Sequence, residues 1–539
     1  KVIFLVDRIE LATQSLDNYR AFADDAGDVQ DTKSTDALRA RLKSPDPKNR
    51  LIVTSIQKMS NIKPGEGGVT QAEVDKLARQ RIVFIVDECH RSTFGDMLQD
   101  IRRSFPNALF FGFTGTPIMD ENQKKGSTTA MVFGDCLHRY SIADGIRDKN
   151  VLGFDPYMVT TYRDSDLRQE VALEKAKARD VGEATSNPQK SKVFYYYMDS
   201  SNVPMGPRVD GAGERIEGIE DFLTSAQYGI GSVHEDMVVQ DIVKQFPVLS
   251  HGNKFHAILA TSSIPEAISY YRLFKEKAPD LRVVGLFDPS IDNNPEGIVK
   301  EDALVELITD YNEVYRKGKN EFTIPTWPLM KKDIAARLAH KAPYENLDAN
   351  REERIDLLIV VDQMLTGFDS KWVNTLYLDK LIAYENIIQA FSRTNRLFGP
   401  EKPFGVIRYY RKPHTMKGFI DAAVKLYSGD RPLDLFVQKL PENISLMDAR
   451  LLEIKSVFEA AGVVDFMQLP PSQEARRKFA KDFVELNGFL EAAKVQGFTW
   501  DKDVYIFKGE DADTELVVRP VIDERTYNIL VVRYKELFK

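Results

Sequence analysis

Cysteine and histidine are scarce in this sequence, and their scarcity excludes several classes of protein. Only two cysteines occur in 539 residues, Cys89 and Cys136. Two thiols cannot form a disulfide framework or a zinc ribbon, which favours a reducing, cytoplasmic setting. The seven histidines are scattered, without the paired spacing of metal ligands. We therefore expect neither a disulfide-stabilised fold nor a structural metal.

Long apolar runs, a leader sequence and net positive charge are missing as well. No stretch of about 18 consecutive apolar residues occurs, so we expect no transmembrane helix and no membrane partner. The chain opens on KVIFLV, without methionine or a signal-peptide pattern, which favours a fragment or the ordered part of a larger protein. The formal net charge is −8, so any nucleic-acid contact has to come from local clusters.

The sequence does contain short apolar runs that end in polar residues. The central run, residues 82–86, is followed at once by Asp87 and Glu88. A short apolar run rich in β-branched residues predicts a strand buried on both faces of a parallel sheet, where ligands bind at the carboxyl ends. Asp87 can hold Mg²⁺ through water and Glu88 can deprotonate an attacking water, as in nucleoside triphosphate hydrolysis. The alternative is an ordinary solvated strand end.

Three further motifs follow in the chain. Residues 110–117, FFGFTGTP, repeat the pattern one βα unit later, with small hydroxyls on either side of a glycine turn. Residues 365–369 read LTGFD, and residues 389–396 read QAFSRTNR. Arg393 and Arg396 lie three apart, so on a helix they share a face and reach one anion. A surface basic helix face is the alternative.

In this order, DECH, TGTP, LTGFD and QAFSRTNR resemble the motifs of superfamily 2 helicases and translocases. The longer strings VDECHRSTFG, VVDQMLTGFD and ENIIQAFSRTNR resemble the restriction (motor) subunit of type I restriction-modification enzymes, and this resemblance covers nearly the whole chain. It implies an ATP-dependent translocase of double-stranded DNA, with ATP and Mg²⁺ as cofactors. It also implies methyltransferase and specificity subunits as partners, and a cytoplasmic location.

The resemblance assigns roles to individual residues. Arg393 and Arg396 are expected to act as arginine fingers on the γ-phosphate across a cleft from Asp87 and Glu88. Asp369 is expected to contact the ribose or a finger arginine. The nucleotide-site support is expected from His90, Thr114, Thr116, Gly367, Asp369 and Gln389. Thr366 stands where the family commonly has arginine, which puts a salt bridge from that position in doubt.

Contacts with the DNA backbone are predicted at three places. The segment VDRIEL resembles motif Ia and offers Arg8 and Gln14 as phosphate contacts, and the alternative is that Arg8 caps a surface turn. Hydroxyl and amide donors follow two predicted strands and suit phosphate oxygens without reading sequence. They are Thr54, Ser55 and Gln57 in the first lobe and Thr261 and Ser262 in the second. A helix cap at Ser263 before Pro265 is an alternative that uses the same helix N-terminus.

The fold class predicted is α/β, with two RecA-like lobes built on parallel sheets and a helical C-terminal domain. The first lobe is expected over residues 1–150, the second over 151–412 and the helical domain over 413–539. A hinge is placed near residues 152–156, and helices are expected at 446–461, 472–495 and 523–538. The helical domain either docks on the methyltransferase or only supports the second lobe.

The motif G-x-x-x-x-G-K-[ST] occurs nowhere in the 539 residues. A DECH site needs that loop, because its amides and lysine hold the β- and γ-phosphates. In the family both this loop and the nuclease lie upstream, so we expect the chain alone to bind and hydrolyse ATP poorly. A nuclease pattern at Asp448 and Glu453–Lys455 is more simply a solvated helix face. Two other functions stay open, another superfamily 2 motor of repair or phage defence and a non-catalytic scaffold.

Overall fold

The computed structural model describes residues 1–6, 19–21, 29–32, 34–89, 93–123, 128–211, 213–287, 298–347, 350–361, 368–428, 435–508 and 515–538. The chain divides into two compact units. The first comprises Lys1–Ser141 and Tyr384–Gln389, and the second comprises Ile142–Ala383 and Ala390–Lys539. The predicted domain boundaries near residues 150 and 412 stay predictions.

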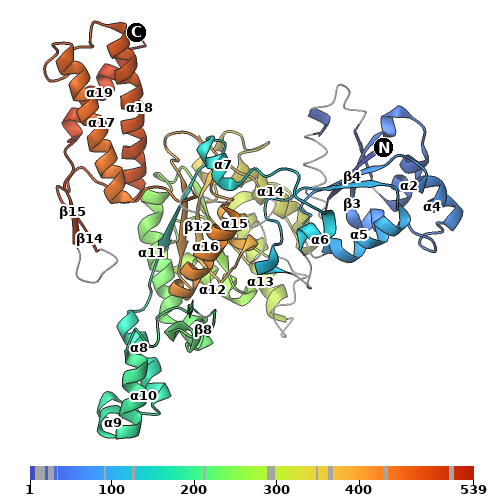
Figure 1. Cartoon of the computed structure of the whole chain (residues 1–539), viewed down its shortest axis with the longest axis horizontal. Coiled ribbons are helices and arrows are strands. Elements are labelled where there is room, and N and C mark those ends of the chain that lie inside the picture. The colour runs from blue at the N-terminus through green and yellow to red at the C-terminus, as the bar shows by residue number, and fades with distance from the viewer. Residues whose placement is uncertain are drawn as a thin grey trace. The chain divides into compact units, whose positions relative to one another are not determined.

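A five-stranded parallel sheet forms the first unit (Figure 1). Its order is β2-β3-β1-β4-β5, with β1 at Val2–Val6, β2 at Val29–Asp31, β3 at Leu51–Ser55, β4 at Val83–Val86 and β5 at Leu109–Gly112. Four of these strands were predicted, whereas β2 has only three residues and gives no pattern. Because β4 and β5 are parallel neighbours, with Val86 opposite Gly112, the residues after both strands emerge at one edge.

Apolar residues cover both faces of this sheet. Alternate strand residues such as Ile3 and Leu5 pack against one helical layer, while Phe4 and Val6 pack on the other face with Tyr19. The helices of this unit are α2 at Thr35–Lys43, α3 at Ile56–Ser60, α4 at Gln71–Ala78, α5 at Thr93–Ser104 and α6 at Thr129–Phe133. Burial on both faces explains why the strands read as continuous apolar runs.

A six-stranded parallel sheet forms the centre of the second unit. Its order is β10-β11-β9-β12-β13-β6, with β6 at Phe154–Met158, β9 at His256–Thr261, β10 at Val283–Leu286, β11 at Leu357–Val360, β12 at Val373–Asp379 and β13 at Gly405–Tyr409. The chain leaves β9 through α12 (Ile264–Lys277) toward β10 and leaves β12 through α15 (Glu385–Phe391) toward β13. These connections diverge, so the topological switch point lies between β9 and β12.

The strand β6 corrects the prediction of a hinge near residues 152–156. Residues 154–158 pair with β13 instead, and Pro156 lies opposite Ile407. Proline has no N–H to donate, and it is accommodated because β6 lies at the edge of the sheet with β13 as its neighbour. The parallel sheets confirm the predicted α/β class.

The other elements of the second unit are mostly helices. The helices before the C-terminal region are α7 at Ile142–Arg147, α8 at Asp164–Lys175, α9 at Val181–Ser186, α10 at Pro188–Met198, α11 at Val233–Leu249, α13 at Ile298–Tyr315, α14 at Trp327–Ala339 and α16 at Pro413–Tyr427, in addition to α12 and α15. Between α10 and α11 lie the short strands β7 (Arg208–Val209) and β8 (Arg215–Ile216) and the 3₁₀ turns η4 (Ile219–Asp221) and η5 (Ser225–Tyr228).

Three helices dominate the C-terminal region, as predicted. They are α17 at Leu440–Ala460, α18 at Gln473–Val495 and α19 at Glu524–Glu536, and Figure 1 shows them packed alongside one another. Their shared core includes Ile454, Phe479 and Leu530. An unpredicted antiparallel hairpin, β14 at Tyr505–Lys508 and β15 at Glu515–Val518, lies between α18 and α19 in the chain.

Candidate functional site

The two candidate catalytic carboxylates follow β4 at the carboxyl edge of the first sheet. The Asp87 N–H donates to the carbonyl of Leu5 at 3.0 Å and extends the ladder by one residue. Glu88 has a φ of 48°, in the left-handed region that costs energy for a residue with a Cβ. Its N–H donates to Asp87 Oδ1 at 2.9 Å. This turn fixes the two carboxylates beside one another at the strand end.

The loops after β4 and β5 are bonded to each other. The Phe113 N–H donates to the Val86 carbonyl at 2.8 Å, and the Cys89 N–H donates back to the Phe113 carbonyl at 3.1 Å. Burial raises the pKa of Cys89 to about 12, so its thiol stays protonated at neutral pH. Cys89 therefore serves as a packing residue of this edge and not as a nucleophile.

The TGTP segment contacts the start of α15. Thr114 Oγ1 accepts a hydrogen bond from the Thr116 N–H at 3.0 Å, and Gln389 Nε2 donates to Thr116 Oγ1 at 2.9 Å. Asn122 Nδ2 donates to Glu385 Oε2 at 3.0 Å. All these residues belong to the first unit, because Tyr384–Gln389 group with it. Three predicted support residues are thus brought together from motifs far apart in the sequence.

Two of the three predicted DNA-contact residues of the first unit, Thr54 and Ser55, make hydrogen bonds within the protein. Thr54 is buried, and its Oγ1 lies 2.7 Å from the donating hydroxyl of Thr32. Ser55 is buried and caps α3, accepting from the Lys58 N–H at 3.4 Å. Gln57 is exposed on the first turn of that helix. Of the three candidates, Gln57 is the one at the surface.

The second unit repeats this arrangement after β9. Thr261 is fully buried and donates to the Val360 carbonyl at 3.3 Å. Ser263 caps α12, and its Oγ accepts from the Glu266 N–H at 3.3 Å. Ser262 is exposed between them, and its Oγ donates to the Asp379 carbonyl at 3.2 Å. The cap chemistry expected as an alternative at Ser263 is therefore present.

The two candidate arginine fingers do not share a helix face, and that expectation is wrong. The helix α15 ends at Phe391, before both arginines. After Phe391 the Arg393 and Thr394 N–H groups donate three residues back, and the Asn395 carbonyl accepts the Leu152 N–H at 2.8 Å outside any helix. The guanidinium groups nevertheless reach consecutive residues. Arg393 donates to the Phe368 carbonyl, and Arg396 Nε donates to Asp369 Oδ1 at 2.6 Å.

Sequence reasoning missed a buried lysine behind this pair. Lys402 is 1% exposed, and its Nζ donates to the carbonyls of Lys371 at 3.0 Å and Val373 at 2.8 Å. Burial, with a smaller contribution from the charge of Arg396, lowers the pKa of Lys402 to about 7. A single lysine in a loop carries no spacing that the sequence could have shown.

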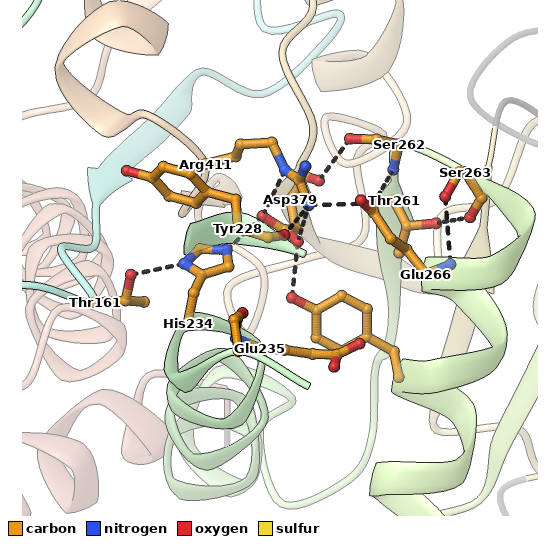
Figure 2. Close-up of polar contacts among 12 residues, drawn as sticks. Thr161, Tyr228, His234, Glu235, Thr261, Ser262, Ser263, Glu266, Asp379 and Arg411 are labelled. Carbon is orange, nitrogen blue, oxygen red and sulfur yellow. Dashed lines mark hydrogen bonds and ion pairs between the residues drawn. The ribbon is translucent and has the colours of Figure 1, made fainter. Parts of the chain in front are cut away.

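A buried polar network centred on Asp379 was also missed (Figure 2). Asp379 ends β12 and is fully buried. Its carboxylate accepts from Tyr270 OH at 2.7 Å and from Arg411 at 3.0 and 3.2 Å. His234 Nε2 lies 2.7 Å from Asp379 Oδ1 and Thr161 Oγ1 lies 2.6 Å from His234 Nδ1. A carboxylate only accepts, so Nε2 of His234 donates to Asp379.

Opposing effects act on the Asp379 carboxyl group. Burial raises its pKa, but the hydrogen bond and charge of His234, with those of Arg411, lower it overall. Arg411 also reaches Glu266 Oε2 at 3.1 Å and donates to the Tyr228 carbonyl at 3.0 Å. The network joins residues from β12, α11, α12 and the segment after β13. No motif predicts its buried ion pairs of Arg411 with Asp379 and Glu266.

Four predicted site residues lie outside the described residues. They are Arg8, Gln14, His90 and Gly367. The nuclease pattern at Glu453–Lys455, by contrast, lies within α17, where Glu453 pairs with Lys478 at 3.0 Å on the helix surface. Asp448 accepts the Val521 and Ile522 N–H groups. The helix-face interpretation of this segment is confirmed.

Membrane-spanning helices and clusters of metal-ligating side chains are both absent from the described ranges. Among their helices, none combines the length and apolarity that crossing a bilayer requires. The same part of the chain contains no group of three or more His, Cys, Asp or Glu side chains placed to hold a metal ion.

Three family models match the chain. The SWI2/SNF2 ATPase model matches residues 1–191. The model for domain 3 of the type I restriction enzyme subunit R matches residues 253–412. The model for the C terminus of the type I restriction and modification enzyme subunit R matches residues 435–539.

Curated relatives agree with these models. The endonuclease subunit of the type I restriction enzyme SauCOLORF180P from Staphylococcus aureus (strain COL) is 33% identical over 506 residues, covering 91% of this chain and 47% of the relative. The corresponding SsaAORF53P subunit from Staphylococcus saprophyticus is 35% identical over 445 residues, covering 80% and 40%. The chain thus spans about half the length of these relatives.

Among solved structures, the ATP-dependent type ISP restriction-modification enzyme LlaBIII bound to DNA matches with a TM-score of 0.44 and 14% identity, covering 92% of this chain and 29% of that one. The sequence matches run in one order along nearly all of the chain and name the same enzyme type in two of the three family models. The chain belongs to the family of type I restriction enzyme R subunits, with an ATPase region of the superfamily 2 type.

Proposed function

We propose that this chain is the motor part of a type I restriction endonuclease, which uses ATP to move double-stranded DNA toward cleavage by a separate nuclease domain. One observation carries this proposal most directly. The Asp87–Glu88 turn and the Thr114–Thr116 turn lie at neighbouring strand ends, and Gln389 of the QAFSRTNR motif donates to Thr116. Three motifs of an ATPase therefore meet in one unit.

The chemistry of these residues suits ATP hydrolysis. A carboxylate held at a strand end, as Asp87 is by its own ladder bond, is a hard oxygen donor of the kind that Mg²⁺ prefers. Bound MgATP supplies the phosphoanhydride bond that is broken. Glu88 orients the attacking water and accepts its proton. Arg393 and Arg396 supply positive charge to the γ-phosphate, a role that can contribute about 10³-fold or more to rate.

The DNA contacts are assigned to groups at the surface. Gln57 and Ser262 are both exposed. Gln57 lies on the first turn of α3, directly after β3, and Ser262 lies between β9 and α12. Amide and hydroxyl groups there hold phosphates without reading base sequence. We assign sequence choice to specificity and methyltransferase subunits and cleavage to another domain, with the complex working in the cytoplasm.

The first prediction tests the catalytic base. In the full-length subunit assembled with its methyltransferase partner, Glu88→Gln is expected to lower DNA-stimulated ATP turnover by about 10² or more, because the amide cannot accept the water proton. ATP hydrolysis is measured with and without duplex DNA. The matched control is Glu453→Gln, the same substitution on the surface of α17, which is expected to keep wild-type turnover.

A second variant tests the finger assignment in the same assay. Arg396→Ala removes the guanidinium that now pairs with Asp369, and turnover is expected to fall while duplex binding is retained. Wild-type turnover in both Glu88→Gln and Arg396→Ala would contradict the proposed mechanism. A full-length wild type without any DNA-stimulated hydrolysis would favour the scaffold function instead.

A further inference from the structure

A groove of about 420 Å³ runs along α12 in the second unit. Six of its lining residues recur along the helix at the spacing of a single face, three and four positions apart. They are Pro265, Ile268, Ser269, Arg272, Leu273 and Glu276. Because the first and last of them are separated by three turns, the groove follows α12 for about 16 Å.

Two other segments supply the rest of the lining. Asp302 and Ala303 lie near the start of α13, and Ile230 lies in the short connection between η5 and α11. Apart from Ile230, every lining residue belongs to a helix. Helices use their backbone N–H and C=O groups internally, so this groove offers a ligand side chains and no strand edge.

Most of the lining is apolar, and part of it is open to solvent. The apolar side chains are those of Ile230, Pro265, Ile268, Leu273 and Ala303. Ile230 is 58% exposed, and Val233 and Met237, one turn apart at the start of α11, are 63% and 40% exposed. Apolar surface of this kind, gathered at a groove, is typical of a site that binds another protein.

The charge left at the groove is negative. Arg272 is neutralised by Glu306 of α13, whose carboxylate accepts from Nε at 3.1 Å and from Nη2 at 2.5 Å. Glu276 and Asp302 are exposed in the lining, and neither forms an ion pair within the described part of the chain. Two carboxylates therefore remain without a cation, and a ligand with lysine or arginine side chains complements them.

Polar contacts between α12 and α13 fix the groove in advance. In addition to the pair of Arg272 and Glu306, Asp310 of α13 accepts from Tyr271 OH at 2.7 Å and from Lys275 Nζ at 2.6 Å. The two helices are thus joined at successive positions along α12. A groove with walls held in this way loses little conformational freedom when a ligand binds.

We propose that this groove docks a basic amphipathic helix of a partner protein. Over about three turns such a helix presents apolar residues at intervals of three and four positions, which suits the apolar stripe along α12. Lysine or arginine side chains beside that stripe reach Glu276 and Asp302. The inference goes beyond the motor function and does not depend on ATP hydrolysis or on DNA binding.

The charges favour a different protein over a second copy of this chain. The formal net charge of the chain is −8, so two copies repel each other, and the two carboxylates of the groove add to that repulsion. A basic helix is instead attracted to the groove. Its affinity is expected to fall as the salt concentration rises, because the carboxylates that attract it are exposed.

The test uses the 539-residue chain and a labelled synthetic helix of about 18 residues, with leucines at intervals of three and four positions and lysines beside them. Binding is titrated by fluorescence anisotropy. Ile230→Asn is expected to weaken binding about tenfold, because it removes an apolar contact without changing the charge. Leu452→Asn is the matched control, since Leu452 is equally exposed, at 58%, on α17 outside the groove.

An exchange of charges tests the basic character of the ligand. Glu276→Lys/Asp302→Lys is expected to bind the lysine peptide about tenfold more weakly than the wild type does. The same variant is expected to bind a peptide with glutamates in place of the lysines about tenfold more tightly. Glu66→Lys/Glu459→Lys makes the same change in net charge at exposed positions outside the groove, and it is expected to leave both affinities unchanged.

Four results would overturn the proposal. The first is a wild type that does not bind the lysine peptide at about 50 mM salt, where screening is weak. The second is equal affinity in the wild type, Ile230→Asn and Glu276→Lys/Asp302→Lys, which would place the peptide elsewhere. Self-association of the chain that Ile230→Asn abolishes would assign the groove to a second copy. Binding by the 539-residue chain but not by the full-length subunit would show that another part of the same subunit covers the groove.

Discussion

At the scale of single residues, Lys402 is a lysine whose side chain is almost fully buried. It is 1% exposed and its ammonium contacts two backbone carbonyls, while the pKa of Lys402 is lowered to about 7, chiefly by burial. Lys371 and Val373 lie in the segment that leads from Asp369 into β12, and Asp369 pairs with Arg396. We therefore assign Lys402 a positioning role behind the candidate finger.

The second prediction concerns the pH dependence of stability. Between pH 7 and the unfolded value of 10.5 the unfolded chain holds the Lys402 proton and the folded chain does not, so stability rises with pH in this window. From pH 7 to 9 the gain is about 2 kcal/mol. Lys402→Met is expected to remove this rise, measured as the difference between wild-type and variant free energies of unfolding in urea.

The control for this experiment is Lys455→Met, on the exposed surface of α17, which is expected to keep the wild-type pH dependence. The variant also leaves the carbonyls of Lys371 and Val373 without their donor, a cost that is the same at every pH and cancels in the comparison. A wild-type minus variant difference that is flat from pH 7 to 9 would contradict the lowered pKa.

At the scale of elements, the Asp379 network fixes how four segments meet at the edge of the second sheet. Asp379 ends β12, and its carboxylate is shared by His234 of α11, Tyr270 of α12 and Arg411 after β13. Buried charges of this kind are stable only while every partner is present. The network therefore holds these four segments to one another.

The third prediction tests this element-level role. Asp379→Asn keeps the size of the side chain but leaves Arg411 with Glu266 as its remaining carboxylate and removes the buried charge that His234 and Tyr270 also contact, so a loss of about 3 to 5 kcal/mol is expected. Urea unfolding measures the change. Asp421→Asn, which breaks the exposed Lys417 pair on α16, is the matched control with an expected loss of about 0.5 kcal/mol or less. Equal effects of the two substitutions would show that the network contributes no special stability.

The same scale shows what the sequence could and could not predict. Strands with apolar runs and polar ends, such as β4 and β9, were predicted because burial on both faces leaves a continuous pattern. The edge strand β6 was not predicted, because a proline such as Pro156 usually interrupts a strand. Only the edge position of β6 in the sheet accommodates it. Arg393 and Arg396 were predicted on a helix, but the helix ends at Phe391, and the segment that follows makes a long-range backbone bond with Leu152 that no local pattern shows.

Contacts between distant residues form the part of the site that no local pattern contains. His234 and Asp379 are 145 positions apart, and Thr116 and Gln389 are 273 apart. Motif resemblance predicted the second pair as members of one site, because both lie in named motifs. His234 and Asp379 lie in no named motif, and neither has a neighbouring residue at a spacing that would predict a functional site. Such a pair becomes visible only when the sheet brings its strand ends together.

At the scale of the whole molecule, DNA binding and nucleotide binding are expected to be separable in this chain. The net charge is −8, so the proposed duplex binding has to rest on local groups such as Gln57 and Ser262 and not on an overall field. Tight nucleotide binding by a DECH site depends on a glycine-rich phosphate loop, and the sequence G-x-x-x-x-G-K-[ST] does not occur among its 539 residues.

The final prediction follows from this separation. The 539-residue chain is expected to bind duplex DNA while its affinity for ATP is weaker than about 1 mM, since Asp87 and Glu88 offer acidic groups but no amide cradle for the β-phosphate. A fluorescent ATP analogue and a labelled duplex are titrated against the same preparation. Full-length subunit, which is expected to bind both, is the positive control. Micromolar ATP affinity in the shorter chain would mean that residues other than a glycine-rich loop hold the phosphates.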